Sequence, residues 1–301
     1  DSHTTGVIPA LSAVIKALTQ PGDKVLIQTP VYNHFFTSIH NSGCQAAESP
    51  LVYRDNTYTI DFDDLERKAA DPAVKLMLLC NPHNPAGRVW TPAELHRIGE
   101  LCLRHDVVVV ADEIHCELVM PGFRYTPFAS LCEEFERRSV TCTSPSKAFN
   151  LAGLQVANIF AADAALRARI GHSLQINETG EIGPFAIEAL IAAYDEGAEW
   201  LDALNEYLHG NYRFSREYFD RNLPQYPVLP LEGTYLVWVD CRASGLTSDE
   251  LETKLLEEAK LRINPGAIYG EAGRDFIRLN IACPRKLLAE GLDRLRKVLK
   301  R

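Results

Sequence analysis

Hydrophobic positions follow two different periods along the chain, and segments of the two kinds alternate over its first half. Segments of strand length, rich in apolar or β-branched residues, span residues 24–29, 74–80, 107–111, 139–144 and 156–162, and the segment 74–80 is nearly continuously apolar. Apolar positions spaced three and four apart, which are typical of helices, span residues 7–19, 30–43 and 91–105, and a short helix starts at Asp61. Strands that alternate with helices in this way predict an α/β fold with a doubly wound, mostly parallel sheet and right-handed crossovers.

The second half of the chain is mostly helical in its spacing. Helices are predicted over residues 164–173, 184–194, 198–222, 248–260 and 284–300, and strands over residues 234–240 and 276–282. These elements predict a smaller α+β domain over residues 201–301, taken together with the long connecting helix, after a large domain over residues 1–200. The chain starts with Asp1-Ser2-His3, which resembles a cut end. Since a strand usually precedes a loop such as Thr4-Thr5-Gly6, we expect an N-terminal segment to be missing.

Composition restricts the partners of the chain. Its 31 Lys and Arg against 40 Asp and Glu give a net charge of −9, which argues against nucleic acids and anionic membranes. The sequence has no apolar run of membrane-spanning length and no visible secretory signal. Its eight cysteines are scattered without a Cys-x-x-Cys pair, so we expect free thiols, a cytoplasmic location and no metal site.

Three polar clusters follow three of the predicted strands. They are Asn81–Gly87, Asp112–His115 and Ser144–Lys147. Ligands of doubly wound sheets bind beyond the carboxyl ends of the strands, so the three clusters predict one shared site. Lys147 follows hydroxyl residues and precedes apolar ones, and in an interior cleft its amine can act as a Schiff-base nucleophile. The alternative is an ordinary exposed lysine.

An aldehyde cofactor on Lys147 requires several other groups, and the sequence offers each of them. Asp112 is the candidate for pairing with a pyridine nitrogen, and Asn84 and His115 are candidates for contacting a phenolic oxygen. Arg278 alternates outward from an apolar strand and suits a substrate carboxylate. Each has a plainer alternative: Asp112 as a helix cap or surface acid, and Arg278 as an exposed strand residue.

Two further requirements are a phosphate site and a partner for the cofactor ring. The helix start at Gly6–Ile8 offers unpaired backbone N–H groups and a positive dipole end, and Ser144 and Ser146 can add hydroxyl donors. An ordinary helix cap is the alternative. Tyr32 is a candidate for stacking on the ring, against the alternative of a core or surface tyrosine.

The ordered motifs now support a resemblance. Asn84-Pro-Ala-Gly87, Asp112-Glu-Ile-His115, Ser144-Pro-Ser-Lys147 and Arg278-Leu-Asn280 together resemble the fold-type I pyridoxal 5'-phosphate (PLP) enzymes of the class I/II aminotransferase superfamily. Gly87-Arg-Val-Trp90 and the run from Pro265 to Pro284 are similar to the MalY/PatB-type cystathionine β-lyases within it. One departure is Ala86, where the family usually has threonine.

The resemblance implies roles for the candidate residues. It implies that Lys147 is the Schiff-base lysine, that Asp112 pairs with the ring nitrogen and that Asn84 lies near the phenolic oxygen. It also implies that Tyr32 lies over the ring and that Arg278 binds the substrate carboxylate. The implied phosphate ligands are Val7, Ile8, Ser144 and Ser146. His115 stands where many aminotransferases carry a tyrosine. The resemblance also implies a homodimer with the active site at the subunit interface and an N-terminal arm that covers the site.

The activity implied is that of a C–S β-lyase. Such an enzyme cleaves cystathionine or related cysteine S-conjugates by β-elimination to a thiol, pyruvate and ammonia. An aminotransferase acting on amino acids and keto acids is the alternative, because both reactions share the loss of the α-proton. A regulatory, protein-binding role on the same fold is a second alternative.

Overall fold

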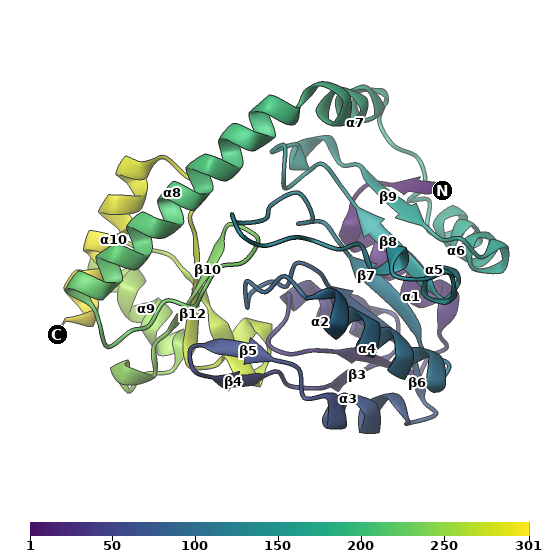
Figure 1. The fold of residues 1–301 in the computed structure, drawn as a ribbon, viewed down its shortest axis with the longest axis horizontal. Helices are drawn as coiled ribbons and strands as arrows, with labels where there is room; N and C mark the ends of the chain where they lie inside the picture. The colour runs from purple at the N-terminus through teal and green to yellow at the C-terminus, as the bar shows by residue number, and fades with distance from the viewer. Residues whose placement is uncertain (301) are drawn as a thin grey trace.

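The computed structural model describes residues 1–300 and is an α/β protein built on a seven-stranded sheet (Figure 1). The strand order is β1 (Ser2–Thr4), β9 (Ala157–Phe160), β8 (Ser139–Thr143), β7 (Val108–Asp112), β6 (Val74–Cys80), β2 (Lys24–Ile27) and β3 (Gln45–Glu48). The five strands from β8 to β3 are parallel to one another, which confirms the predicted doubly wound, mostly parallel sheet.

Helices cover both faces of this sheet. Helices α1 (Val7–Leu18), α2 (Asn33–Asn41) and α6 (Ala164–Ile176) share one core with it, and α3 (Phe62–Ala69), α4 (Pro92–Arg104) and α5 (Glu133–Arg137) share another. Alternate residues of β6 enter opposite cores: Leu76 and Leu78 face the α1 side, and Met77 and Leu79 face the α4 side. Burial on both faces is why this strand has a nearly continuous apolar sequence.

Two strands at one edge of the sheet differ from the prediction. Strand β9 runs antiparallel to β8, because the connection over residues 144–156 contains a 3₁₀ turn and lacks a helix to carry the chain back for a parallel return. Residues 2–4, two of which belong to the segment that resembles a cut end, form β1 and pair with residues 157–159 of β9 in antiparallel register. Their polar side chains gave no strand pattern.

The C-terminal part forms a second layer around a smaller antiparallel sheet. Helices α7 (Pro184–Glu196) and the 25-residue α8 (Ala198–Asn222) lead to β10 (Leu236–Asp240), α9 (Ser248–Ala259), β11 (Asn264–Pro265), β12 (Phe276–Asn280) and α10 (Arg285–Leu299). A hairpin of β4 (Val52–Arg54) and β5 (Thr57–Thr59) lies beside it, and its Tyr58 packs near Phe276 of β12. The domain boundary near residue 200 stays a prediction.

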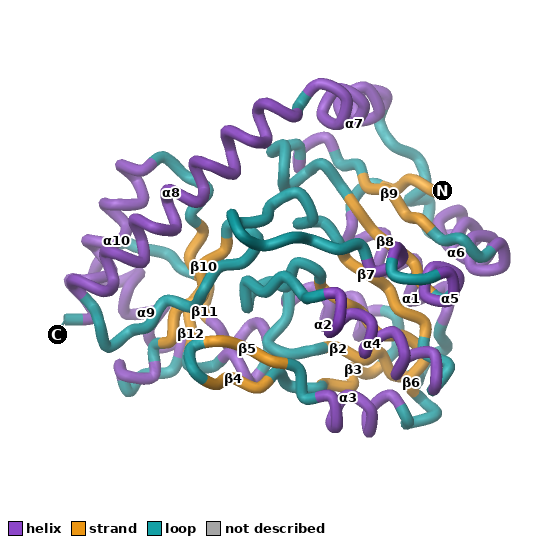
Figure 2. Tube along the Cα trace, viewed as in Figure 1, coloured by secondary structure: helices purple, strands orange, loops and turns teal. Residues whose placement is uncertain are grey.

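Loops connect the two sheets at the centre of the molecule. In Figure 2, loop segments fill the space between the carboxyl ends of the central strands and strands β10 and β12. The connecting segments contain short 3₁₀ turns at Phe128–Ser130, Ala152–Leu154, Arg242–Ser244, Gly266–Tyr269 and Glu271–Gly273. This central region holds the polar clusters predicted from the sequence.

Candidate active site

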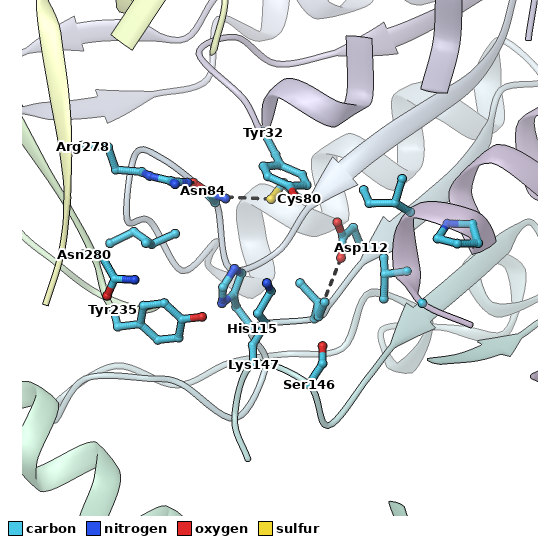
Figure 3. Close-up of a pocket in the computed structure, with 16 residues that line it drawn as sticks. Tyr32, Cys80, Asn84, Asp112, His115, Ser146, Lys147, Tyr235, Arg278 and Asn280 are labelled. Carbon is cyan, nitrogen blue, oxygen red and sulfur yellow. Dashed lines mark hydrogen bonds between the residues drawn. The ribbon is translucent and has the colours of Figure 1, made fainter. Parts of the chain in front are cut away.

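Adjacent parallel strands bring the three polar clusters to one edge of the large sheet. Strands β6, β7 and β8 are neighbours. Asp112 ends β7, Asn84 and Lys147 follow β6 and β8, and all three residues line one cavity of about 320 Å³ (Figure 3). Arg278 of β12 closes the cavity from the smaller sheet. A cavity of this size suits a small molecule. The other lining residues are Gly6, Val7, Ile8, Pro9, Tyr32, Cys80, Ile114, His115, Ser146, Tyr235, Leu236 and Asn280.

Asp112 presents a buried carboxyl group to the cavity. It is the last residue of β7 and is 3% exposed, and one of its oxygens accepts a hydrogen bond from the Ile114 N–H at 3.2 Å. Burial, with a smaller contribution from the neighbouring Glu113, raises its pKa from 3.8 to about 7, although the hydrogen bond from Ile114 and the charge of Lys147 oppose the rise. A cationic ligand beside this group would favour its ionised form.

Lys147 lies at the end of a turn that Ser144 holds together. The Ser144 hydroxyl donates to the Val156 carbonyl at 2.6 Å and accepts from the Ser146 N–H at 3.1 Å. Ser144 is therefore engaged within the turn and lies outside the lining of the cavity, whereas Ser146 and Lys147 line it. The Lys147 amine has no hydrogen bond or ion pair with any of residues 1–300 and is free to react with a ligand.

Arg278 is a largely buried cation without an acidic partner among residues 1–300. Its terminal nitrogens donate to Asn84 Oδ1 at 3.0 Å and Asn264 Oδ1 at 3.2 Å, and its guanidinium lies 4.9 Å from the centre of the Tyr269 ring. Burial lowers its pKa. Both amides are neutral acceptors, so the positive charge remains available for a carboxylate of a ligand.

Tyr32 and His115 lie between these charged groups and are both uncharged. Burial and the nearby Asp112 raise the pKa of Tyr32, which keeps its hydroxyl protonated. Burial, followed by the positive charges of Lys147 and Arg278, lowers the pKa of His115 to about 3. The His115 Nδ1 is buried without a hydrogen-bond partner in the described chain, so this nitrogen can form a hydrogen bond with a ligand.

The start of α1 forms the end of the cavity nearest Asp112 (Figure 3). Gly6 is its N-cap and provides no side-chain cap, and the first turn contains no acidic residue. Val7 and Ile8 therefore offer unpaired backbone N–H groups at the positive end of a 12-residue helix. Such a helix start can bind a phosphate or another anion.

Cys80 and Tyr235 are among the lining residues that the sequence analysis did not assign to the site. Cys80 ends β6, and its sulfur accepts a hydrogen bond from the Asn84 N–H at 3.4 Å, which braces the loop that carries Asn84. Tyr235 precedes β10 and lies edge-on to His115, with ring centres 5.8 Å apart. Cys80 had a detectable signal, because it directly precedes the polar cluster. Within residues 1–300, no group of three or more His, Cys, Asp or Glu could hold a metal ion.

The fold and the cavity define a doubly wound α/β protein. Its site combines a free lysine, a buried carboxyl group and an arginine that has no acidic partner among residues 1–300. The chain belongs to the aminotransferase class I and II family, whose sequence model matches residues 3–295. It is 44% identical to cystathionine β-lyase PatB of Bacillus subtilis, over 99% of this chain and 77% of that protein. It is 35% identical to protein MalY of Escherichia coli, over 97% of this chain and 75% of that protein.

Solved structures agree with these relatives. Cystalysin from Treponema denticola, whose crystal structure contains PLP, superposes with a TM-score of 0.97 at 37% identity, covering 99% of this chain and 76% of that one. The PLP-bound C–S lyase of Staphylococcus hominis superposes with a TM-score of 0.92 at 31% identity, covering 99% and 77%. These comparisons confirm the resemblance drawn from the sequence motifs.

Proposed function

We propose that this protein is a PLP-dependent C–S β-lyase that cleaves cystathionine or related cysteine S-conjugates to a thiol, pyruvate and ammonia. One observation carries the proposal: Lys147, Asp112 and Arg278 line a single cavity in a chain closely similar to cystathionine β-lyases. The same relatives support PLP as the cofactor, since the similar structures are PLP-bound.

The groups in the cavity fit PLP at three separate points. Asp112 is a buried carboxyl group that a protonated ring nitrogen would stabilise as an anion. The uncapped start of α1, with Val7, Ile8 and the neighbouring Ser146, suits the phosphate. Lys147 has a free amine for the aldehyde. The placement of Ser144 within its turn supports an indirect role, in which it shapes the turn that carries Ser146.

The remaining groups suit an amino-acid substrate. Arg278 binds the substrate carboxylate through its terminal nitrogens, and its bond to Asn84 fixes the guanidinium in place. The Lys147 amine removes the proton from the α-carbon. When bound, PLP supplies an electron sink that stabilises the negative charge left at that carbon. Tyr32 and His115 cover the cofactor position and contribute uncharged hydrogen-bonding groups.

Product analysis tests this function against the alternatives. PLP-loaded protein should release thiol and pyruvate from cystathionine in equal amounts. Transfer of the amino group to a keto acid without thiol release would favour an aminotransferase, whose first step also needs Lys147 and Arg278. Absence of both reactions in PLP-loaded protein would favour the regulatory role.

We also propose that the protein is a homodimer. Large apolar side chains are exposed on α7 and on the helices before and after it in the sequence: Phe185 of α7 is 80% exposed, and Ile176 at the end of α6 is 68% exposed. Ile187, Ile191 and Trp200 are each nearly half exposed. Patches of this kind mark protein interfaces, and a second copy is the occupant that the family suggests. Light scattering should give about twice the 33.6 kDa chain mass, and a monomer would contradict the proposal.

A cytoplasmic location completes the proposal. All eight cysteines are free thiols, and five of them are buried, as expected in a reducing compartment. No helix in the described part of the chain has the length and apolar character needed to cross a membrane. Fractionation of cells that express a tagged copy would test this location, and recovery with membranes would contradict it.

A further inference from the structure

Tyr235 has a hydroxyl group that the proposed function leaves without a role. Its side chain is half-buried and lines the cavity, and its hydroxyl makes no hydrogen bond to any of residues 1–300. The ring lies edge-on to His115. A buried tyrosine usually directs its hydroxyl to a partner, so an unpaired one that faces a cavity is available to a ligand.

The backbone just before Tyr235 is strained. Thr234 adopts a φ of 71°, a left-handed conformation that is a genuine outlier for a β-branched residue. It is fully buried, and its N–H donates to the Leu118 carbonyl at 2.8 Å while its hydroxyl accepts from the Leu236 N–H at 3.1 Å. Such a conformation costs about 1–3 kcal/mol and persists where the surroundings impose it.

The surroundings do impose it, because the chain passes through a narrow gap. A Cβ atom on Gly233 would lie 2.8 Å from Val89 Cγ2 and 3.1 Å from the Leu118 carbonyl oxygen. The Gly233 N–H also donates to the Gly87 carbonyl at 3.1 Å. The segment before β10 is thus fixed against two loops around the site, and the strained turn at Thr234 directs Tyr235 into the cavity.

The hydroxyl of Tyr235 faces the middle of the cavity. Figure 3 shows its ring between Asn280 and His115, with the oxygen directed toward Lys147 and away from Arg278. A substrate bound between Arg278 and Lys147 would occupy the cavity that this oxygen faces. Tyr32 lines the same cavity and lies near Arg278 and Tyr235 as well as Asp112 and Cys80, but the proposed function already places its ring over the cofactor.

We propose that Tyr235 is a catalytic residue that donates its hydroxyl proton to the sulfur leaving the β-carbon. This assignment rests on the proposed β-lyase function. The Cα–H bond breaks with its proton passing to Lys147, a Cα=Cβ double bond forms, and the Cβ–S bond breaks with its electron pair on sulfur. The Tyr235 O–H bond then breaks as an S–H bond forms, and the phenolate regains a proton from water.

Two of the other groups nearby, His115 and Ser146, are less suited to this proton transfer. His115 is held neutral by burial and the neighbouring cations. Ser146 has a far less acidic hydroxyl. Lys147 becomes an ammonium when it takes the α-proton and is the competing donor, and full kcat of Tyr235→Phe on S-ethylcysteine would assign the transfer to it. Burial raises the pKa of Tyr235 while Arg278 opposes the rise, so the phenol is protonated at neutral pH. Phenols and alkyl thiols have similar ordinary pKa values, which favours proton transfer between them.

The test is Tyr235→Phe. The matched control is Tyr207→Phe on α8, where the half-exposed tyrosine accepts a hydrogen bond from the Arg285 N–H at 2.8 Å and does not line the cavity. Two substrates are compared: S-ethylcysteine, whose thiolate leaves poorly, and S-(4-nitrophenyl)cysteine, whose thiolate leaves without protonation. Tyr235→Phe should lower kcat about 100-fold for the first and less than about threefold for the second. The dissociation constants for PLP and for L-alanine, followed by the visible absorbance of the cofactor, should not change.

A purely structural role gives a different result. Equal losses on the two substrates, no loss on S-ethylcysteine, or weakened binding of PLP or L-alanine would overturn the assignment of Tyr235 while leaving the lyase function intact. Failure of the wild-type protein to release thiol from either substrate would overturn the proposed function, and the assignment of Tyr235 with it.

Discussion

Replacing Asp112 by asparagine should stabilise the cofactor-free protein at neutral pH. Burial raises the pKa of Asp112 from 3.8 to about 7, so the folded protein binds more protons than the unfolded chain between these values. Stability therefore falls as the pH rises through this window and remains lower above it. At about 1.4 kcal/mol per pKa unit, keeping this carboxylate ionised costs the fold up to about 4 kcal/mol.

Asparagine has nearly the same shape and does not ionise. It can still accept the hydrogen bond from the Ile114 N–H, so the local turn should survive. We expect cofactor-free Asp112→Asn to resist urea better than the wild-type protein at pH 8, by as much as about 4 kcal/mol. At pH 4 the difference should shrink to less than about 1 kcal/mol, because Asp112 is then protonated in the folded state.

The control is Asp220→Asn, which changes an exposed carboxylate on α8. It should alter the unfolding free energy by less than about 0.5 kcal/mol at either pH. A gain for Asp112→Asn that is absent at pH 8, or equal at both pH values, would refute the reasoning. The same substitution should weaken PLP binding and lower lyase kcat about 100-fold or more, because the charge that stabilises the ring nitrogen is lost.

Two further substitutions test the carboxylate site and the packing of the smaller sheet. Arg278→Lys should raise the KM for cystathionine about tenfold or more at nearly constant thermal stability. The reason is that an ammonium group cannot form the bidentate hydrogen bonds that a guanidinium forms with a carboxylate. An unchanged KM would contradict this role of Arg278. Gly266→Ala should destabilise the protein by more than about 2 kcal/mol in urea, because its Cβ would lie 2.0 Å from the Gly273 carbonyl oxygen. Gly171→Ala, with nothing within 4 Å, is its control, and equal effects would refute the argument.

The sequence predicted the long, strongly patterned elements well. The strand over residues 74–80 and the helix over residues 198–222 have the predicted bounds, and the capping box of Thr91 and Glu94 forms at the start of α4. The strand and the helix have many apolar positions with a single period, and the capping box consists of two residues three positions apart. Both signals are therefore visible in the local sequence. Strands β1, β3 and β11 are short and partly polar, so their existence depends on partners that lie far away in the sequence.

The candidate site was predicted as a set of residues, and its internal contacts were not. Parallel strands made it possible to place Asn84, Asp112 and Lys147 at one edge. The hydrogen bond between Asn84 and Arg278 joins residues 194 positions apart, and no local pattern reports it. The hydrogen bond from the Ser144 hydroxyl to the Val156 carbonyl, twelve residues later, likewise depends on the three-dimensional path of the turn. The position of Tyr235 depends on a left-handed threonine that sequence patterns do not predict.

The most direct measurement of the central claim compares wild-type protein, Lys147→Ala and Lys75→Ala, an exposed-lysine control, after incubation with PLP. Visible absorbance and the release of thiol and pyruvate from cystathionine are recorded together. The wild-type and control proteins should show the absorbance of lysine-linked PLP and release both products, whereas Lys147→Ala should show neither. Thiol release retained by Lys147→Ala would contradict the assignment of Lys147 and the mechanism built on it.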